Sequence, residues 1–347
     1  DILNFEGSSN FTNNINSGGD NDTLNFNGPA TFAAGTTINS GTGNDIWNFN
    51  SLTQHTIAAN LNSDEGTNTF NFNDSTIFAG AITTGPTSTN NFNFNGSPTF
   101  QQPITGGGGV DTFNFMTGSP IFAANNVISG GGNDDIFDFR DYDGVFPNPV
   151  IFEGNVGGDR FLFNAGTTNV SNIIINGGTG NAPDGLPSGQ GDTAQFDNYS
   201  GNAPKMTNMQ TVEVKNSSTI NFNNQGTPYT MSGNVVGDNS NNTLNYQDAT
   251  TFSGPITLGS GNDTINISGA PIFQQSVNMG AGDNVFSVTG TPNFAGGTSV
   301  ISFAGKDTFS FNSPTPYTFN ASLDSDGNDD TFIFRANDKT TFAGTIQ

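Results

Sequence analysis

Hydrophobic and polar residues alternate in short runs along the chain, and these runs recur at a regular interval. In residues 21–27, apolar Leu24 and Phe26 alternate with polar neighbours, the period-two pattern of a strand with one buried face. We take the second apolar residue of each run as an anchor. Most successive anchors lie 21 to 24 residues apart, and the exceptions are the intervals 163 to 196 and 196 to 222. The anchors are Phe5, Phe26, Phe49, Phe72, Phe94, Phe115, Phe139, Phe163, Phe196, Phe222, Tyr246, Ile267, Val288, Phe311 and Phe334.

Three further columns appear when the anchors are aligned. The residue two positions before the anchor is apolar in every unit, and the residue between them is Asn in nine of fifteen units. The residue four positions before the anchor is Asp ten times, Asn four times and Ser once. Self-similarity at a fixed period of this length is the signature of a stacked repeat architecture.

Each unit contains two further apolar segments. A short second strand follows the first, as at Thr31-Phe32 and Thr99-Phe100, and a third apolar position such as Ile38 or Ile104 completes the unit. No segment shows a helical stripe with a period of 3.6 residues. A single unit cannot bury its own phenylalanines, whereas units stacked about 4.8 Å apart bury them all. We therefore predict an all-β fold, a parallel β-solenoid (β-helix) of about 15 coils of 21–24 residues with three short strands per coil.

The repeat also predicts the organisation and core of the chain. We expect one continuous solenoid over residues 1–347, with lateral insertions near 140–148 and 177–191. Phe26, Phe49, Phe72, Phe94 and Phe115 should stack in one buried column, since rings at the strand spacing form offset ladders. The asparagine columns should form amide ladders on the outside or at the corners.

Composition narrows the class of protein further. The 347 residues carry a net charge of −23, with seven Lys and Arg in all, which disfavours nucleic acid and anionic membranes as partners. The 33 phenylalanines argue against disorder. The chain has no cysteine and no run of 18 apolar residues, so no membrane insertion is expected and export in an unfolded form is favoured. We expect a segment of a larger secreted, bacterial protein.

A glycine-rich turn carries the one chemical motif of the repeat. The segments 41–47, 107–113 and 259–265 follow the pattern G-x-G-x-D-x-apolar, which resembles the calcium-binding nonapeptide of RTX proteins. The resemblance implies that turn carbonyls and the Asp carboxylates hold Ca²⁺ along one edge of the solenoid. The alternative is that a tight stacked turn simply needs Gly, Asn and Asp. The candidate calcium ligands are Asp22, Asp45, Asp111, Asp135, Asp159, Asp192, Asp263, Asp307 and Asp330.

A second resemblance covers most of the chain. Residues 21–38, with their strand, bend and strand ending in Thr-Thr-Ile, resemble the β-strand repeat of autotransporter passengers, and related coils recur along the sequence. That family consists of β-helical rods without cysteine on Gram-negative cell surfaces. The resemblance implies an extracellular location and a role in adhesion or self-association.

Enzymatic function would need acid–base groups outside the repeat pattern. The one histidine, His55, occupies an ordinary strand position, and Asp141 and Asp143 in the first insertion are the least repeat-like acids. The basic residues are scattered, at Arg140, Arg160, Lys205, Lys215, Lys306, Arg335 and Lys339. We therefore predict that the protein is not an enzyme.

Threonine pairs such as Thr83-Thr84 suggest an ice-binding face but do not fall in one regular column.

The leading hypothesis is an extracellular structural or adhesive β-solenoid, a surface stalk or passenger segment of a larger secreted protein. The main alternative is a self-assembling extracellular filament subunit that stacks end to end, because exposed sheet edges template further pairing. Polysaccharide-active and ice-binding β-helices are weaker alternatives. The expected partners are other copies of the chain or a ligand on a host or cell surface, with Ca²⁺ as the candidate cofactor.

Overall fold

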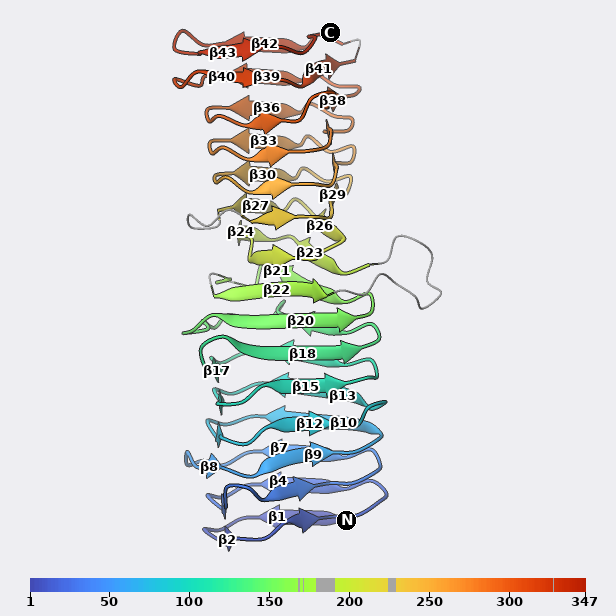
Figure 1. Ribbon diagram of the computed structural model, residues 1–347, viewed down its shortest axis with the longest axis vertical. Helices are drawn as coiled ribbons and strands as arrows, with labels where there is room; N and C mark the ends of the chain where they lie inside the picture. The colour runs from blue at the N-terminus through green and yellow to red at the C-terminus, as the bar shows by residue number, and fades with distance from the viewer. Residues whose placement is uncertain (168, 171, 179–190, 224–228, 327) are drawn as a thin grey trace. The chain divides into compact units, whose positions relative to one another are not determined.

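The computed structural model describes residues 1–347 except 168, 171, 179–190, 224–228 and 327, and every regular element in the described part is a β-strand (Figure 1). The chain divides into two compact units. Unit 1 comprises residues 1–162 and 166–192, and unit 2 comprises residues 163–165 and 193–347. Each unit is a parallel β-solenoid, and each is described by itself. The prediction of one continuous solenoid over the whole chain stays a prediction.

Unit 1 contains three parallel sheets, and each coil as far as the one that contains β17 contributes one strand to each sheet. The first sheet contains β1 (Ile2–Phe5), β4 (Thr23–Phe26), β7 (Ile46–Phe49), β10 (Thr67–Phe72), β13 (Thr89–Phe94), β16 (Thr112–Phe115), β19 (Ile136–Asp138) and β21 (Arg160–Asn164). The second contains β2 (Asn10–Phe11), β5 (Thr31–Phe32), β8 (Thr56–Ile57), β11 (Ile77–Phe78), β14 (Thr99–Phe100) and β17 (Ile121–Phe122). The third contains β3 (Ile15–Asn16), β6 (Thr37–Asn39), β9 (Asn60–Ser63), β12 (Ile82–Thr84), β15 (Ile104–Gly107), β18 (Asn126–Gly132), β20 (Val150–Val156) and β22 (Ile173–Gly178).

Unit 2 repeats this arrangement with its own strands. One sheet contains β23 (Thr193–Asp197), β26 (Thr211–Lys215), β29 (Asn234–Gly237), β32 (Ile256–Thr257), β35 (Val277–Asn278), β38 (Ser299–Ser302) and β41 (Ser322–Ser325). The next contains β24 (Ser200–Asn202), β27 (Thr219–Phe222), β30 (Thr243–Tyr246), β33 (Thr264–Ile267), β36 (Val285–Val288), β39 (Thr308–Phe311) and β42 (Thr331–Phe334). On the third face, β28 (Thr230–Met231), β31 (Thr251–Phe252), β34 (Ile272–Phe273) and β37 (Asn293–Phe294) form a four-stranded sheet, and β40 (Tyr317–Phe319) pairs with β43 (Thr340–Phe342). Strand β25 (Lys205–Thr207) belongs to neither of these two sheets.

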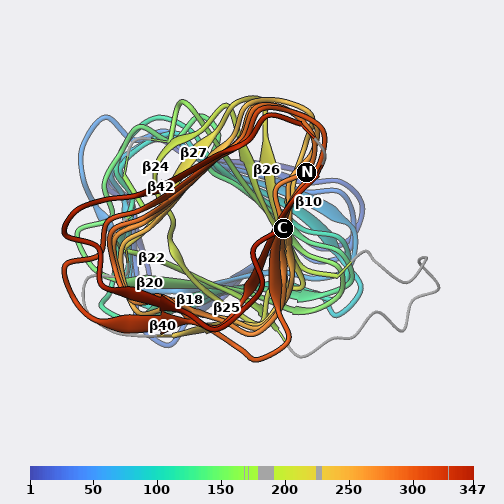
Figure 2. The same ribbon diagram turned by 90° about the horizontal axis from the view of Figure 1, so that it is seen from above.

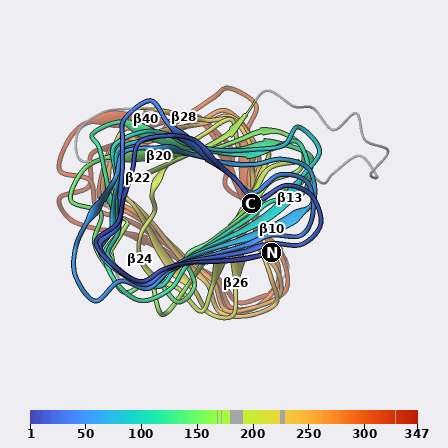
Figure 3. The same ribbon diagram turned by 90° about the horizontal axis from the view of Figure 1, so that it is seen from below.

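Strands of successive coils pair in parallel and in register, as the repeat predicted. Phe5 lies opposite Phe26, and Phe72 lies opposite Phe94. Seen along the stacking direction, the coils within each unit overlie one another (Figure 2, Figure 3). Apolar side chains fill the space that each backbone coil encloses, because alternate residues of every strand point inward.

A ladder of stacked phenylalanines forms the centre of unit 1. Ring centroids of successive anchors from Phe5 to Phe139 lie 4.5–5.3 Å apart, with interplanar angles of 2–20°. From Phe26 onward these rings are at most 1% exposed. The predicted column of Phe26, Phe49, Phe72, Phe94 and Phe115 is therefore confirmed.

Two further aromatic ladders pack against the first. Trp47 begins a stack in which successive ring centroids lie 4.7–5.5 Å apart as far as Phe161. In the second sheet, Phe78 and Phe100 stack at 5.0 Å. Phe78 also meets Phe49 edge-on, at 4.8 Å and 89°. Stacking along the axis and edge-to-face contact across it are both favourable ring geometries.

The outer surface of the first sheet carries an asparagine ladder. From Asn25 to Asn114, each side-chain amide donates a hydrogen bond to the amide oxygen of the preceding coil, at 2.8–2.9 Å. A second ladder runs beside it from Asn27 to Asn95, with hydrogen bonds of 2.8–3.3 Å. The predicted outward amide ladders therefore form.

The anchor column is not continuous in unit 2. Phe196 in β23 lies opposite Val214 of β26, whereas Phe222 in β27 belongs to the neighbouring sheet. The expectation that Phe196 and Phe222 share a column is wrong. Strand β26 has no anchor motif, yet it continues the sheet of β23. Since strands of both sheets have the same period-two pattern, periodicity cannot show which sheet a strand joins.

The first predicted insertion does not project sideways along its whole length. Between β19 and β20, Tyr142 and Phe146 are 1% exposed. Their ring centroids lie 6.2 and 5.7 Å from that of Phe115, so the segment supplies core side chains where no strand of the second sheet forms. Most of the second insertion, 177–191, lies outside the described residues. Its first two residues end strand β22.

Candidate functional site

The predicted aspartates line up in successive coils within each unit, before strands of the β1 sheet in unit 1 and before strands of the β24 sheet in unit 2, and their side chains point into the solenoid. Nearly all members are at most 1% exposed, and Asp330 is partly exposed. The reason is the alternation of side chains along a strand. The aspartate lies four residues before the anchor, so it points inward together with the anchor and with the apolar residue two positions before the anchor. In β10, for example, Asn68, Phe70 and Phe72 are all buried. This alternation is a signal that the sequence already contained.

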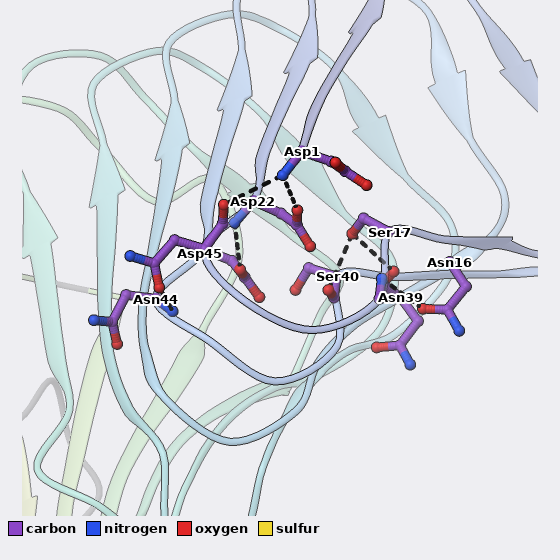
Figure 4. Close-up of polar contacts among 10 residues, drawn as sticks. Asp1, Asn16, Ser17, Asp22, Asn39, Ser40, Asn44 and Asp45 are labelled. Atoms are coloured by element: carbon purple, nitrogen blue, oxygen red, sulfur yellow. Dashed lines mark hydrogen bonds and ion pairs between the residues drawn. The ribbon is translucent and has the colours of Figure 1, made fainter.

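Each rung of the column joins two coils of the same unit. One carboxylate oxygen accepts a hydrogen bond from the backbone N–H of the equivalent residue one coil earlier. Figure 4 shows this contact from the Asp22 N–H to Asp45 Oδ1, at 2.9 Å. The same bond measures 2.7 Å from Asp111 N–H to Asp135 Oδ1, and 2.7 Å from Asn242 N–H to Asp263 Oδ1 in unit 2. The side chains thus satisfy buried backbone donors at the turn.

The second oxygen of the carboxyl group has a different environment. Oδ2 has no hydrogen-bond partner in Asp22, Asp45, Asp111, Asp135, Asp159, Asp263 and Asp307. A buried carboxylate oxygen without a donor is costly. The coils that carry Asn instead of Asp show what surrounds this position.

Asparagine in the column uses the equivalent atom as a donor. Asn90 Nδ2 lies 2.6 Å from Gly106 O of the next coil. Asn242 Nδ2 lies 3.1 Å from Ser240 O, and Asn284 Nδ2 lies 3.0 Å from Gly282 O. The inner atom of the column therefore faces carbonyl oxygens, which are hydrogen-bond acceptors.

Glycine five residues before the column makes room for the carboxyl group in three successive coils. A Cβ on Gly106, Gly130 or Gly154 would collide with Oδ2 of the aspartate five residues later in its own turn. Our sequence reading assigned no role to these glycines at this position. Other coils carry serine there. Burial raises the pKa values of Asp45 and Asp307, and the Ser40 and Ser302 hydroxyls oppose that rise.

Burial shifts the acidity of the column strongly. Desolvation raises the pKa of Asp111 to about 8 against the hydrogen bonds from Asn90. Desolvation also raises the pKa of Asp135 to about 9, with a further rise from neighbouring carboxylates. The pKa of Asp159 rises to about 8 for the same first reason, and that of Asp263 to about 7. In each case the neutral acid is favoured because the ion loses its hydration.

The described acidic and histidine side chains do not by themselves supply the ligand set of a calcium site. Calcium requires six to eight oxygens at about 2.3–2.6 Å. Within the described residues, no three acidic or histidine side chains gather closely enough to hold a metal ion. One oxygen of each rung is already engaged with a backbone N–H. Calcium binding by this column stays a prediction.

The other candidate residues do not assemble into a site. His55 is buried, and its Nδ1 lies 3.4 Å from Thr53 O and 3.5 Å from Thr76 Oγ1, which is consistent with a structural role. Asp141 and Asp143 are exposed on the segment after β19. Arg140 pairs with Asp138, two residues away. Within the part of the chain that the structure describes, no helix is long and apolar enough to cross a membrane.

These features define the class of the protein as a parallel β-solenoid repeat protein with aromatic, amide and carboxyl ladders along its coils. The comparisons give no more particular assignment. No family model matches the chain, and no curated protein or solved structure matches it either.

Proposed function

We propose that the chain is a non-enzymatic structural segment outside the cell, a stalk or adhesive spacer of a larger secreted protein. The observation that carries the proposal is the use of outward polar groups to join coils. Asn71, for instance, donates to Asn48 and accepts from Asn93, at 2.8 and 2.9 Å. Hydrogen bonds between the side chains of successive coils extend and stiffen a stack of coils, whereas catalysis requires acid and base groups that converge.

Two sequence properties support an extracellular role. The net charge of −23 favours solubility at a surface. The coil repeat of residues 21–38 resembles autotransporter passengers, which are surface solenoids. We infer that the ligand, if the segment is adhesive, meets the uncharged amide face or the acidic turns.

The location is tested on intact cells of the organism that makes the protein. Antibodies against this chain should label unpermeabilised cells, and external protease should remove the label without lysing them. Deletion of these coils should reduce attachment to host cells or to an abiotic surface. Labelling that requires permeabilisation would contradict the proposal.

End-to-end assembly is distinguished by sedimentation of the purified chain over a range of concentrations. A stalk segment should sediment as one species. A filament subunit should give progressively larger species, which would favour the filament hypothesis.

A second candidate, ice binding, is favoured by one observation that the sequence reading missed. On the outward face of unit 2, the register aligns Thr219, Thr243 and Thr264 in successive coils, and Thr308 with Thr331 further along. The column is interrupted by Val285. A flat array of hydroxyl and methyl groups at the strand spacing of about 4.8 Å is a surface that can order water.

An ice recrystallisation assay separates this candidate from the first. If the face binds ice, the chain should inhibit recrystallisation, and Thr264→Lys should abolish the effect. Thr230→Lys, on the exposed side of β28, is the matched control. If the chain does not inhibit recrystallisation, the ice-binding hypothesis is wrong.

A further inference from the structure

The aspartate column poses a question that the structural role does not answer: how a stack of buried carboxyl groups is tolerated. The clearest stretch is Asp111, Asp135 and Asp159, in three successive coils of unit 1. Each is fully buried, and each Oδ2 lacks a donor. Asp134 and Asp192 are among the charged groups that act on this stretch. Both are acidic, so they disfavour ionisation as well.

Asn90 shows which chemical group fits this stretch. It occupies the same column one coil before Asp111, and its Nδ2–H₂ donates to Gly106 O. The next coil offers the equivalent carbonyl. Gly130 O lies 2.6 Å from the point where a Cβ on Gly106 would stand, and Asp111 Oδ2 lies even closer to that point. A carboxylate oxygen beside a carbonyl oxygen is repelled, whereas a protonated carboxyl group donates to it as the amide does.

We propose that Asp111, Asp135 and Asp159 are carried as neutral carboxylic acids in the folded solenoid, each holding a proton that the unfolded chain releases. Oδ1 accepts the backbone N–H of the preceding coil, and the Oδ2–H group of Asp111 donates to the carbonyl of Gly130. Folding then takes up protons at neutral pH. The column is a proton-binding ladder, and the solenoid is stabilised by acid.

The sign of the pH dependence follows from linkage. The folded pKa values of about 8, 9 and 8 lie above the unfolded value of 3.8. The stabilisation is therefore complete below the unfolded pKa and is lost as pH rises through the folded pKa values. Between these limits, each group should lower the folding equilibrium constant about tenfold per pH unit. Ordinary acid denaturation has the opposite sign.

The test is thermal unfolding of the full chain between about pH 5 and pH 9. The wild type should lose melting temperature as pH rises. The triple variant Asp111→Asn, Asp135→Asn, Asp159→Asn carries amides that cannot ionise, so it should show a flatter dependence and a higher melting temperature at the alkaline end. The matched control is Asp141→Asn, which removes an exposed charge and should leave the slope unchanged. The reciprocal variant, Asn90→Asp, should steepen it.

Two results would overturn the proposal. The first is a wild-type melting temperature that is constant or rises with pH. The second is a fall in melting temperature with EDTA, restored by calcium chloride and accompanied by a less stable triple variant, which would show that the column holds a cation. If the triple variant fails to fold, the carbon-13 chemical shifts of the wild-type carboxyl groups show whether these groups are protonated or ionised. Protonated shifts for these three residues at neutral pH support the proposal, and ionised shifts refute it.

Discussion

Replacing Phe72 by alanine is the most direct test of the ladder in the core. The ring is fully buried and stacks on Phe49 and Phe94, with centroids 5.3 and 5.1 Å away. It also meets Phe78 and Phe100 edge-on, at 5.2 and 5.1 Å. A buried Phe→Ala change costs about 3–5 kcal/mol, and each aromatic pair adds about 0.5–1.5 kcal/mol beyond burial. We expect a loss near the upper limit, about 4–5 kcal/mol.

The chain supplies its own reporter for this measurement. Trp47 is the one tryptophan, and it is buried in unit 1 with its ring centroid 5.5 Å from that of Phe70. Its fluorescence during urea unfolding therefore follows unit 1. Leu52→Ala, a change at a fully exposed side chain of the same unit, should shift the free energy of unfolding by about 0.5 kcal/mol or less. A Phe72→Ala variant within about 1 kcal/mol of wild type would refute the ladder as the main source of stability.

Three other predictions use the same protein. Gly41→Ala should lower the free energy of unfolding by about 3 kcal/mol, because φ is +82° and the new Cβ would overlap the carbonyl oxygen of Gly18. The control is Gly35→Ala, where φ is +81° but no atom lies within 4 Å of the new Cβ. It should lower the free energy of unfolding by only about 1 kcal/mol in the same assay. Asn71→Ala removes one donated and one accepted amide hydrogen bond and should lower the free energy of unfolding by about 1 kcal/mol, with no change in circular dichroism. The purified chain should release no reducing ends from polysaccharides; turnover that a single substitution abolishes would show that the protein is an enzyme.

Much of the fold could be predicted because it depends on local pattern. Alternation around Leu24 and Phe26 fixes a strand with one inward face, and the interval between anchors fixes the coil length. Rings repeated at that interval have to stack once coils pair in register, so the Phe26 to Phe115 ladder followed directly. The amide ladder followed for the same reason on the opposite face.

The candidate site could be located but not characterised. The sequence placed Asp111 and Asp135 in one column, and their parity with the anchors already implied an inward direction. The raised pKa values, however, arise from burial among three coils and, at Asp135, from carboxylates of the neighbouring coils, against the N–H of the preceding coil, which lowers them. Those groups are 20 or more residues away along the chain, so no local motif encodes their effect.

The sequence by itself determined the strands of the repeat, the coil period and the core side chains of those strands, because each depends on a pattern within one coil. The tertiary structure alone decided which sheet each strand joins, as Phe196 and Phe222 show. It also decided that Tyr142 and Phe146 enter the core instead of projecting from it. The physical reason is the same in both cases. Strands with equal alternation are interchangeable until hydrogen bonds and packing between distant coils select one register.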